Sequence, residues 1–280
     1  MKIRKIVLVC NPSQPLAEQL ARQLADFLHQ KGLQSEILND YRLLPQIPQA
    51  DLCISLGGDG TALRCARQTA PLSIPLLAIN CGSLGFLSAC EAQEAQHYLE
   101  QVLAGNFHIT QRVLLQGKIL RHNTPAEENL LAFNDCVIKT TDPLAFSLRA
   151  DWNGKELKHF YGDGVIISTP SGSTAYSLAA GGPILAPDLD AWVITPICPH
   201  SLTERPIILR ADGQLSFEPL FRNQEEKVAV SFDGQHSYLL QPSEKVCLQR
   251  YPHKAQLIGP VPFDFFGRLR RKLEWGKRNA

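Results

Sequence analysis

The chain has 280 residues, 44% hydrophobic and 20% charged, which are the proportions of an ordinary globular protein. Its 28 Lys and Arg balance 27 Asp and Glu to a formal charge of +1, which excludes a global basic field for gripping nucleic acid. A locally basic nucleotide site is still compatible with this balance, because net charge does not describe how charges are distributed.

The first third of the chain alternates strand and helix patterns. Short apolar runs predict strands that are covered on both faces, and amphipathic spacing between them predicts helices. In chain order the predicted elements are strand 6–9, helix 16–31, strand 33–38, strand 52–56, helix 62–68, strand 74–79 and helix 91–104. This alternation indicates an α/β domain with mostly parallel strands over residues 1–105.

From residue 106 to about 260 the pattern changes to short apolar or alternating runs separated by turn residues. Strands are predicted at 113–121, 130–140, 144–151, 164–169, 192–197, 214–218, 227–232 and 245–250, and only 174–180 has a helical pattern. Asn153-Gly154 is a typical hairpin turn. Residues 106–260 are therefore interpreted as a β-rich second domain. Residues 263–275 predict a short helix, and the segment 260–280 is a candidate to complete the first domain.

Eight cysteines occur, and no two have the CxxC spacing of a zinc or thioredoxin-like site. Most have apolar neighbours, so they are interpreted as buried thiols in a reducing, cytoplasmic compartment. No stretch approaches the ~18 apolar residues that span a membrane, and the run 6–10 is too short for a signal peptide. Neither a membrane nor a nucleic acid is expected as a partner.

The sequence Gly57-Gly58-Asp59-Gly60-Thr61 follows an apolar strand and precedes a helix. It therefore lies at the carboxyl end of a sheet, where open α/β sheets bind ligands. Glycines and a helix N-terminus suit a phosphate, whereas a carboxylate repels one unless it orients an attacking hydroxyl or meets the phosphate through Mg²⁺. The alternative is a glycine-rich turn in which Asp59 caps the next helix.

A second glycine turn, Gly82-Ser83-Leu84-Gly85-Phe86-Leu87, follows the fourth predicted strand. By its position it would lie beside the first loop and form the other wall of a crevice. The alternative is an ordinary connection between a strand and a helix.

The stretch from Asp163 to Tyr176 leads from a buried strand into a loop dense in hydroxyls and then into a short helix. Hydroxyls and amides at a helix start suit ribose and phosphate, and Tyr176 offers a ring for stacking. The alternative is a turn in which Ser173 or Thr174 is the helix N-cap.

The pair Asn134-Asp135 interrupts the apolar run 130–138. Adjacent residues of a strand point to opposite faces, so at least one of the two is expected to be buried. Together they could clamp a ribose diol or an adenine edge, and the alternative is a bulge or a strand end.

Other enzyme classes leave no signature in this sequence. Neither a GxSxG elbow nor an HExxH motif is present, so a serine hydrolase and a metal enzyme of that type are not indicated. The basic run near the C-terminus, from Arg268 to Arg278, is interpreted as a solvated helix face.

Taken together, these segments resemble the NAD kinase family. The resemblance continues beyond the motifs above and covers nearly the whole chain, with matching pieces at 163–164, 181–184, 196–202, 205–207 and 233–235. The GGDGT motif alone is shared with lipid kinases, whereas the stretch 168–184, STPSGSTAYSLAAGGPI, is much more specific.

The resemblance implies a Rossmann-like N-terminal domain and a β-rich C-terminal domain with NAD between them. It implies ATP as donor (polyphosphate in some members), a divalent metal, Mg²⁺, and a homodimer or homotetramer whose neighbouring subunit supplies part of the pocket. Asp59 corresponds to the general base. The implied nucleotide-binding residues are Gly57, Gly58, Gly60, Thr61, Phe86, Asn134, Asp135, Lys158, His159, Asp163, Thr174, Ala175, Tyr176 and Gln235.

Two positions depart from the family pattern. Asp135 stands where the family usually has Glu, and Tyr161 stands where many members have an arginine that contacts the 2′-phosphate of the product. Lys158 or His159 is a candidate substitute for that arginine. A lipid kinase and a non-catalytic NAD(P) sensor are the alternative functions, and a sensor has no need of the carboxylate at Asp59.

Overall fold

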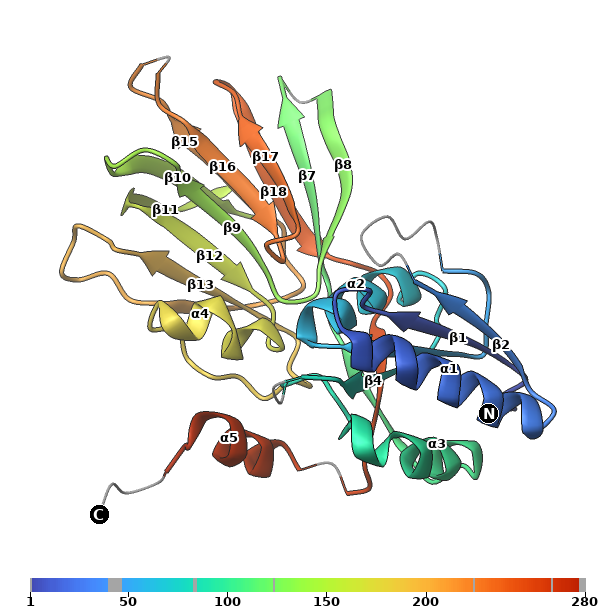
Figure 1. Cartoon of the computed structure of the whole chain (residues 1–280). Coiled ribbons are helices and arrows are strands. Elements are labelled where there is room, and N and C mark those ends of the chain that lie inside the picture. The colour runs from blue at the N-terminus through green and yellow to red at the C-terminus, as the bar shows by residue number, and fades with distance from the viewer. Residues whose placement is uncertain are drawn as a thin grey trace. The chain divides into compact units, whose positions relative to one another are not determined.

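The computed structural model describes residues 2–39, 47–82, 85–122, 124–223, 225–262 and 264–276 (Figure 1). The chain forms two compact units. The first unit consists of Met1–Arg112 together with His253–Ala280, and the second is the continuous segment Val113–Pro252.

The first unit is built on a sheet with the strand order β2-β1-β3-β4-β19-β6, to which β5 adds on β4. Its strands are β1 (Lys5–Cys10), β2 (Gln34–Leu38), β3 (Leu52–Gly57), β4 (Leu76–Asn80), β5 (Cys90–Glu91), β6 (His108–Arg112) and β19 (Ala255–Gly259). Paired strands run parallel, apart from β6, which is antiparallel to β19. The predicted α/β class is confirmed for this unit.

Helices α1 (Pro15–Gln30), α2 (Asp59–Thr69), α3 (Ala95–Leu103) and α5 (Phe265–Leu273) complete the first unit. In α1 the apolar spacing sets the burial, since Leu20, Leu24 and Leu28 are buried, whereas Leu16 in the first turn is exposed. Helix α2 begins at Asp59, three residues before the predicted start, so the acidic residue belongs to its first turn. In the part of the chain that the structure describes, no helix has both the length and the apolar character that crossing a membrane requires.

The second unit consists of two antiparallel sheets, with strand orders β11-β10-β15-β18-β7-β8 and β14-β13-β12-β9-β16-β17. Its elements are β7 (Leu115–Arg121), β8 (Thr124–Ala132), β9 (Asp135–Thr140), β10 (Phe146–Trp152), β11 (Lys155–Gly162), β12 (Gly164–Ser168), α4 (Tyr176–Ala179), β13 (Ala191–Ile197), β14 (Ile207–Arg210), β15 (Leu215–Leu220), β16 (Val228–Phe232), β17 (His236–Leu240) and β18 (Glu244–Arg250). Side chains of both sheets, Trp192 and Phe217 among them, share one core. The predicted β-rich class is confirmed.

The single strand predicted over 130–140 is wrong. Strand β8 ends at Ala132 in one sheet and β9 starts at Asp135 in the other, so Phe133 and Asn134 carry the chain across the core. Both sides of this break are apolar and buried, and the hydrophobic pattern therefore continues through it. Periodicity does not distinguish a strand from a crossing between two sheets when both sheets face the same core.

Strands β5, β6, β14, β17 and β19 carry no strand prediction. Of these, β6, β14 and β17 lie at the edge of a sheet, whereas β19 lies between β4 and β6. In β14 and β17 most side chains are exposed or half-buried, so the apolar alternation that marks a strand is missing. Strands β6 and β19 also extend the sheet of the first unit, although they lie within residues 106–260.

Candidate active site

The first glycine loop joins β3 to α2. At Gly57 a Cβ would lie 2.5 Å from the Thr61 hydroxyl oxygen, so this position accepts no side chain without displacing Thr61. Gly58 is the N-cap of α2, and its carbonyl accepts from the amides of Thr61 and Ala62 at 3.1 and 3.2 Å. The loop is therefore held by main-chain bonds and by its own first helical turn.

The Asp59 carboxylate does not cap α2, so the capping alternative is wrong. Instead, Oδ2 of Asp59 accepts from the Phe86 amide at 2.8 Å, and Oδ1 accepts from the Leu87 amide at 3.2 Å. The second glycine turn therefore lies against the first loop, as its position predicts. Two amide donors on one carboxylate fix the direction in which its remaining lone pairs point. Ser83 and Leu84 of this turn lie outside the described residues.

Gly85 makes this contact possible. A Cβ at Gly85 would lie 2.0 Å from Oδ1 of Asp59, so any side chain there collides with the carboxylate. A glycine is required here for close approach, and no unusual backbone angle is involved.

Gly85→Ala tests whether Asp59 is the reacting group of this site. If it is, kcat should fall by roughly 10- to 100-fold, because misplacing a reacting group by about 1 Å costs on that order. The fold should survive, since the displaced atoms are the end of a side chain. Gly82→Ala is the matched control: its Cβ would meet only Gln14, at an ordinary 3.6 Å. Steady-state kinetics and thermal melting of both variants test this, and equal kcat values would exclude the role of Gly85.

In the second unit, Asp233 organises the break between β8 and β9. Its carboxylate accepts from three consecutive amides, Phe133 at 2.9 Å, Asn134 at 2.7 Å and Asp135 at 3.2 Å. The Asp233 amide in turn donates to the Asp135 carbonyl at 2.9 Å. Sequence reasoning quoted Asp233 only as part of a family motif and missed this role, because the partners lie about a hundred positions away in the sequence.

The hydroxyl-rich segment packs against the same break. The Thr169 hydroxyl donates to the Phe133 carbonyl at 2.6 Å, and a Cβ at Gly172 would lie 2.1 Å from the Asn134 carbonyl oxygen. Ser173 donates to the Pro170 carbonyl at 2.7 Å, and no side-chain cap bond forms at the start of α4. Most of these hydroxyls therefore build the loop, and the N-cap alternative is wrong.

A cavity of about 330 Å³ opens at this point of the second unit. Four of the predicted residues line it, namely Asn134, Asp135, Ala175 and Tyr176. The other lining residues are Val137, Lys139, Ser231, Asp233 and Gly234. The cavity therefore combines carboxylates, an amide, a hydroxyl and a lysine with one aromatic ring, a set that suits a polar ring-bearing ligand.

Asp135 has the most perturbed acidity in this cavity. Only 5% of its surface is exposed, and burial, followed by the nearby charge of Asp233, raises the pKa of its carboxyl to about 7. A carboxyl with this pKa changes its charge near neutral pH, which is the behaviour expected of a functional site.

The remaining predicted residues of the second unit do not line this cavity. Asp163 directly precedes β12. Gly164, the first residue of β12, pairs with Lys139 of the cavity lining, whereas Asp135 pairs with Ser168 at the other end of the strand, roughly 15 Å from Asp163 at the usual rise of a strand. The Thr174 hydroxyl donates to the Ser171 carbonyl at 3.3 Å, and the Gln235 amide donates to Phe232 at 3.0 Å.

Lys158 and His159 each have a carboxylate partner, Glu204 at 2.7 Å and Glu156 at 3.6 Å. The cation beside Tyr161 is instead Arg222, whose pKa is raised first by Glu226 and further by the Tyr161 hydroxyl. The charge near the position of the missing arginine therefore comes from a distant part of the sequence.

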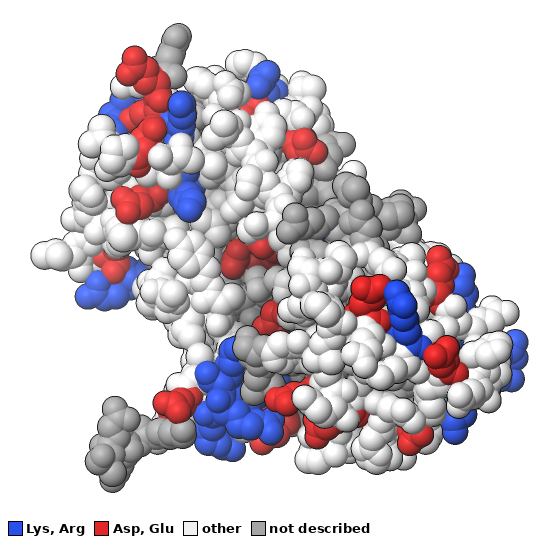
Figure 2. Space-filling view, in the orientation of Figure 1, with Lys and Arg blue, Asp and Glu red and all other residues white. Residues whose placement is uncertain are grey.

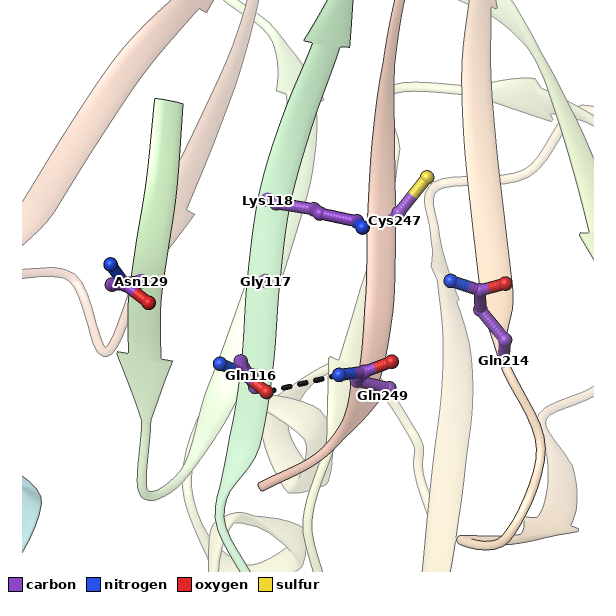
Figure 3. A pocket seen from close by; sticks show the side chains of 7 residues that line it. All are labelled: Gln116, Gly117, Lys118, Asn129, Gln214, Cys247 and Gln249. Atoms are coloured by element: carbon purple, nitrogen blue, oxygen red, sulfur yellow. Dashed lines mark hydrogen bonds between the residues drawn. The ribbon is translucent and has the colours of Figure 1, made fainter. Parts of the chain in front are cut away.

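A second cavity of the second unit, about 180 Å³, lies on the sheet that contains β7 and β18 (Figure 3). Its lining is dominated by carboxamides, and Gln249 donates to Gln116 at 3.0 Å. The described lining residues include no carboxylate to act as a base, and none of the predicted residues is among them.

The model of the ATP-NAD kinase N-terminal domain matches residues 39–107, and that of the ATP-NAD kinase C-terminal domain matches residues 134–259. An NAD kinase of Treponema denticola is 37% identical over 278 residues, covering 98% of this chain and 97% of the relative. An NAD kinase of Geotalea daltonii is 36% identical over 288 residues, covering 99% and 100%.

Two solved structures share the fold. A yeast NADH kinase complexed with NADH has a TM-score of 0.85 at 23% identity and covers 100% of this chain and 90% of its own. An NAD kinase from Archaeoglobus fulgidus in complex with ATP has a TM-score of 0.75 at 21% identity, with coverages of 96% and 97%.

These findings define a kinase enzyme. They are the α/β unit with a carboxylate in its glycine loop, the antiparallel second unit, and the relatives named as kinases. The match extends over both units and nearly the full length, which a lipid kinase sharing only the GGDGT domain would not give. The chain belongs to the ATP-NAD kinase family. The predicted family is confirmed, and neither alternative function is favoured.

Proposed function

We propose that this chain transfers the terminal phosphoryl group of ATP to the 2′-hydroxyl of the adenosine ribose of NAD, giving NADP. The observation that carries the proposal is the Asp59 carboxylate, which two amides of the facing loop hold at the start of α2. The family membership of the chain and the activity named for its relatives support the same reaction.

Asp59 accepts or orients the proton of the attacking hydroxyl. The bond from the ribose oxygen to the phosphorus forms as the bond to the leaving diphosphate oxygen breaks. Little covalent chemistry falls to the protein in such a transfer, so positioning and charge stabilisation supply most of the rate. The main chain of Gly58 and Gly60 at the N-terminus of α2 suits the phosphates of the donor.

A divalent metal, Mg²⁺, fits this loop if Asp59 and the phosphates of the donor bind it together. Among the described residues there is no cluster of three His, Cys, Asp or Glu that could hold a metal alone. Magnesium sites commonly use only one or two carboxylates together with substrate phosphates, and Asp59 is a carboxylate at the phosphate loop. When bound there with the donor, the metal would neutralise charge on the transferring phosphate.

We propose that NAD uses the cavity of the second unit, with Asn134 and Asp135 as hydrogen-bond partners of its ribose or adenine edge and Tyr176 packing along it. All three line the cavity, and Tyr176 is 42% exposed, as a stacking platform must be. Lys139, absent from the sequence prediction, adds a cation that suits a phosphate.

NAD affinity should depend on pH through Asp135. Since the folded-state pKa of this carboxyl is raised to about 7, it is largely protonated at pH 6 and largely ionised at pH 8. If the ionised form accepts hydrogen bonds from ribose, the NAD affinity should fall about tenfold from pH 8 to pH 6. The same shift means that ionisation of Asp135 destabilises the fold as the pH rises toward 7.

Calorimetric titration of NAD at pH 6, 7 and 8 measures this dependence. Asp135→Asn is the matched variant, because its amide does not titrate, and its weaker NAD affinity should vary little with pH. If the NAD affinity of Asp135→Asn depends on pH as strongly as that of the unchanged protein, a group other than Asp135 causes the dependence.

We further propose a homodimer or homotetramer in a reducing, cytoplasmic compartment. Eight free thiols support the compartment. Light scattering coupled to size-exclusion chromatography measures the subunit count, and a monomer would exclude a shared pocket.

The decisive experiment is an assay of NADP formation by the purified chain from NAD, ATP and Mg²⁺. A panel with other nucleoside triphosphates, polyphosphate and NADH then defines donor and acceptor. Phosphorylation of sphingosine or diacylglycerol in place of NAD would establish the lipid kinase alternative, and NAD binding without turnover would establish the sensor.

A further inference from the structure

Helix α5 is fixed in register at its start. The Asp264 carboxylate accepts from the Gly267 amide at 2.7 Å, and a Cβ at Gly267 would lie 1.9 Å from the same carboxylate. One helical turn later, Leu269 is almost fully buried and anchors the helix in the first unit. Arg268 lies between the Gly267 contact and the buried Leu269, so the position of its Cα is fixed.

The Arg268 guanidinium donates a hydrogen bond to the carbonyl oxygen of Phe86. That oxygen belongs to the peptide group between Phe86 and Leu87, whose N–H donates to Oδ1 of Asp59 at 3.2 Å. A single peptide group therefore connects the guanidinium to the carboxylate. Hydrogen bonds arranged in series polarise and strengthen one another, and both ends of this series are charged groups.

The other cations of α5 behave differently. Arg270, Arg271 and Lys272 are exposed, and Figure 2 shows blue atoms gathered over this helix. Arg268 is half-buried, and burial, followed by the neighbouring Arg271, lowers the pKa of its guanidinium, whereas Asp59 raises it. Partial burial of a cation is unfavourable unless it gains partners, and the Phe86 carbonyl is one.

We propose that Arg268 is a positioning residue for Asp59, acting through the peptide group between Phe86 and Leu87. The inference rests on the proposed function, in which Asp59 receives the hydroxyl proton. Arg268 does not touch the reacting atoms in this arrangement. Its loss frees this peptide group to rotate, so the carboxylate keeps its charge and the Phe86 amide but loses the Leu87 amide as a fixed second donor.

Arg268→Met retains an unbranched apolar stem and removes the donors and the charge. It should lower kcat by roughly 10- to 100-fold, the range expected for losing a charge-assisted hydrogen bond in the transition state. If Arg268 acts through Asp59 and not through a substrate, the KM values for ATP and NAD should change less than about threefold. Arg268→Gln retains a neutral donor and should fall between Arg268→Met and the unchanged protein.

Arg270→Met is the matched control, since this exposed neighbour on the same helix should keep full activity. Thermal melting of all variants shows whether the fold is intact. Either Arg268 variant with an intact fold and an unchanged kcat would overturn the proposal. If Arg268→Met does not fold, the kcat of Arg268→Gln alone tests the proposal.

A double-mutant cycle with Asp59→Asn separates positioning from a structural role. If Arg268 acts through the carboxylate, Arg268→Met should reduce the residual kcat of Asp59→Asn by no more than about twofold. Additive losses would show that Arg268 acts elsewhere and overturn this inference alone. Full activity of Asp59→Asn would instead overturn the role of Asp59 in the proposed function, and this inference with it.

Discussion

Asp59→Asn is expected to lower kcat by about 10²–10⁴-fold, because the amide cannot accept the proton of the attacking hydroxyl. The substitution is nearly isosteric, yet the carboxylate accepts from two amides, those of Phe86 and Leu87. An asparagine offers one oxygen, so its NH₂ group must face one of these donors. A modest loss of stability, about 1–2 kcal/mol, should therefore accompany the loss of turnover.

Single-turnover kinetics with saturating ATP and NAD measure the chemical step, and calorimetry measures whether NAD still binds. Asp26→Asn, an exposed carboxylate in helix α1 of the same unit, is the control and should change neither quantity. A kcat near that of the unchanged protein, with normal NAD binding, would remove Asp59 from the reaction.

The largest expected effect on stability is that of Asp233→Ala. Removing the carboxylate leaves three amides, those of Phe133, Asn134 and Asp135, without this acceptor. Hydrogen bonds to a charged group contribute about 1.5–3 kcal/mol each, and relief of the repulsion with Asp135 offsets part of the loss. A net loss of at least about 3 kcal/mol is expected, which lowers the Tm by roughly 10 °C.

Urea unfolding and thermal melting measure this loss. Asp212→Ala is the control in the same unit, because its carboxylate forms an exposed ion pair with Arg210 that should contribute less than about 1 kcal/mol. Equal stabilities of the two variants would show that Asp233 does not hold the break between β8 and β9. The carboxyl of Asp135 should also titrate closer to its ordinary range in Asp233→Ala, since one cause of its raised pKa is gone.

The two glycine loops illustrate what local sequence predicts well. Gly57 and Asp59 occur between an apolar strand and a helix, so their place at the carboxyl end of the sheet follows from neighbouring residues alone. The partner of Asp59 is different, because the amides of Phe86 and Leu87 come from a loop 27 and 28 positions further on. Main-chain groups exist at every residue, and a sequence therefore gives no sign of which one will bind.

Two long-range contacts show where sequence reasoning ends. The break at Phe133 and Asn134 depends on Asp233, and no local signal distinguishes it from a polar interruption within a strand. Arg268, Arg270 and Arg271 belong to one basic run, so the sequence alone predicts a solvated face for all three. Only the packing of α5 separates the half-buried Arg268 from the exposed residues around it.

Strand β19 has a consequence for the order in which the protein is made. It pairs with both β4 and β6, yet it follows β6 by about 140 residues, which a ribosome adds in roughly 7–30 s. Throughout that interval β6 lacks its partner strand, and the edge of β4 is covered only by the two-residue strand β5, so both leave unpaired backbone of the kind that templates association between chains. The second unit, Val113–Pro252, is uninterrupted and is complete before β19 exists. The sheet that the ribosome begins first, that of the first unit, is therefore completed last, when β19 is synthesised.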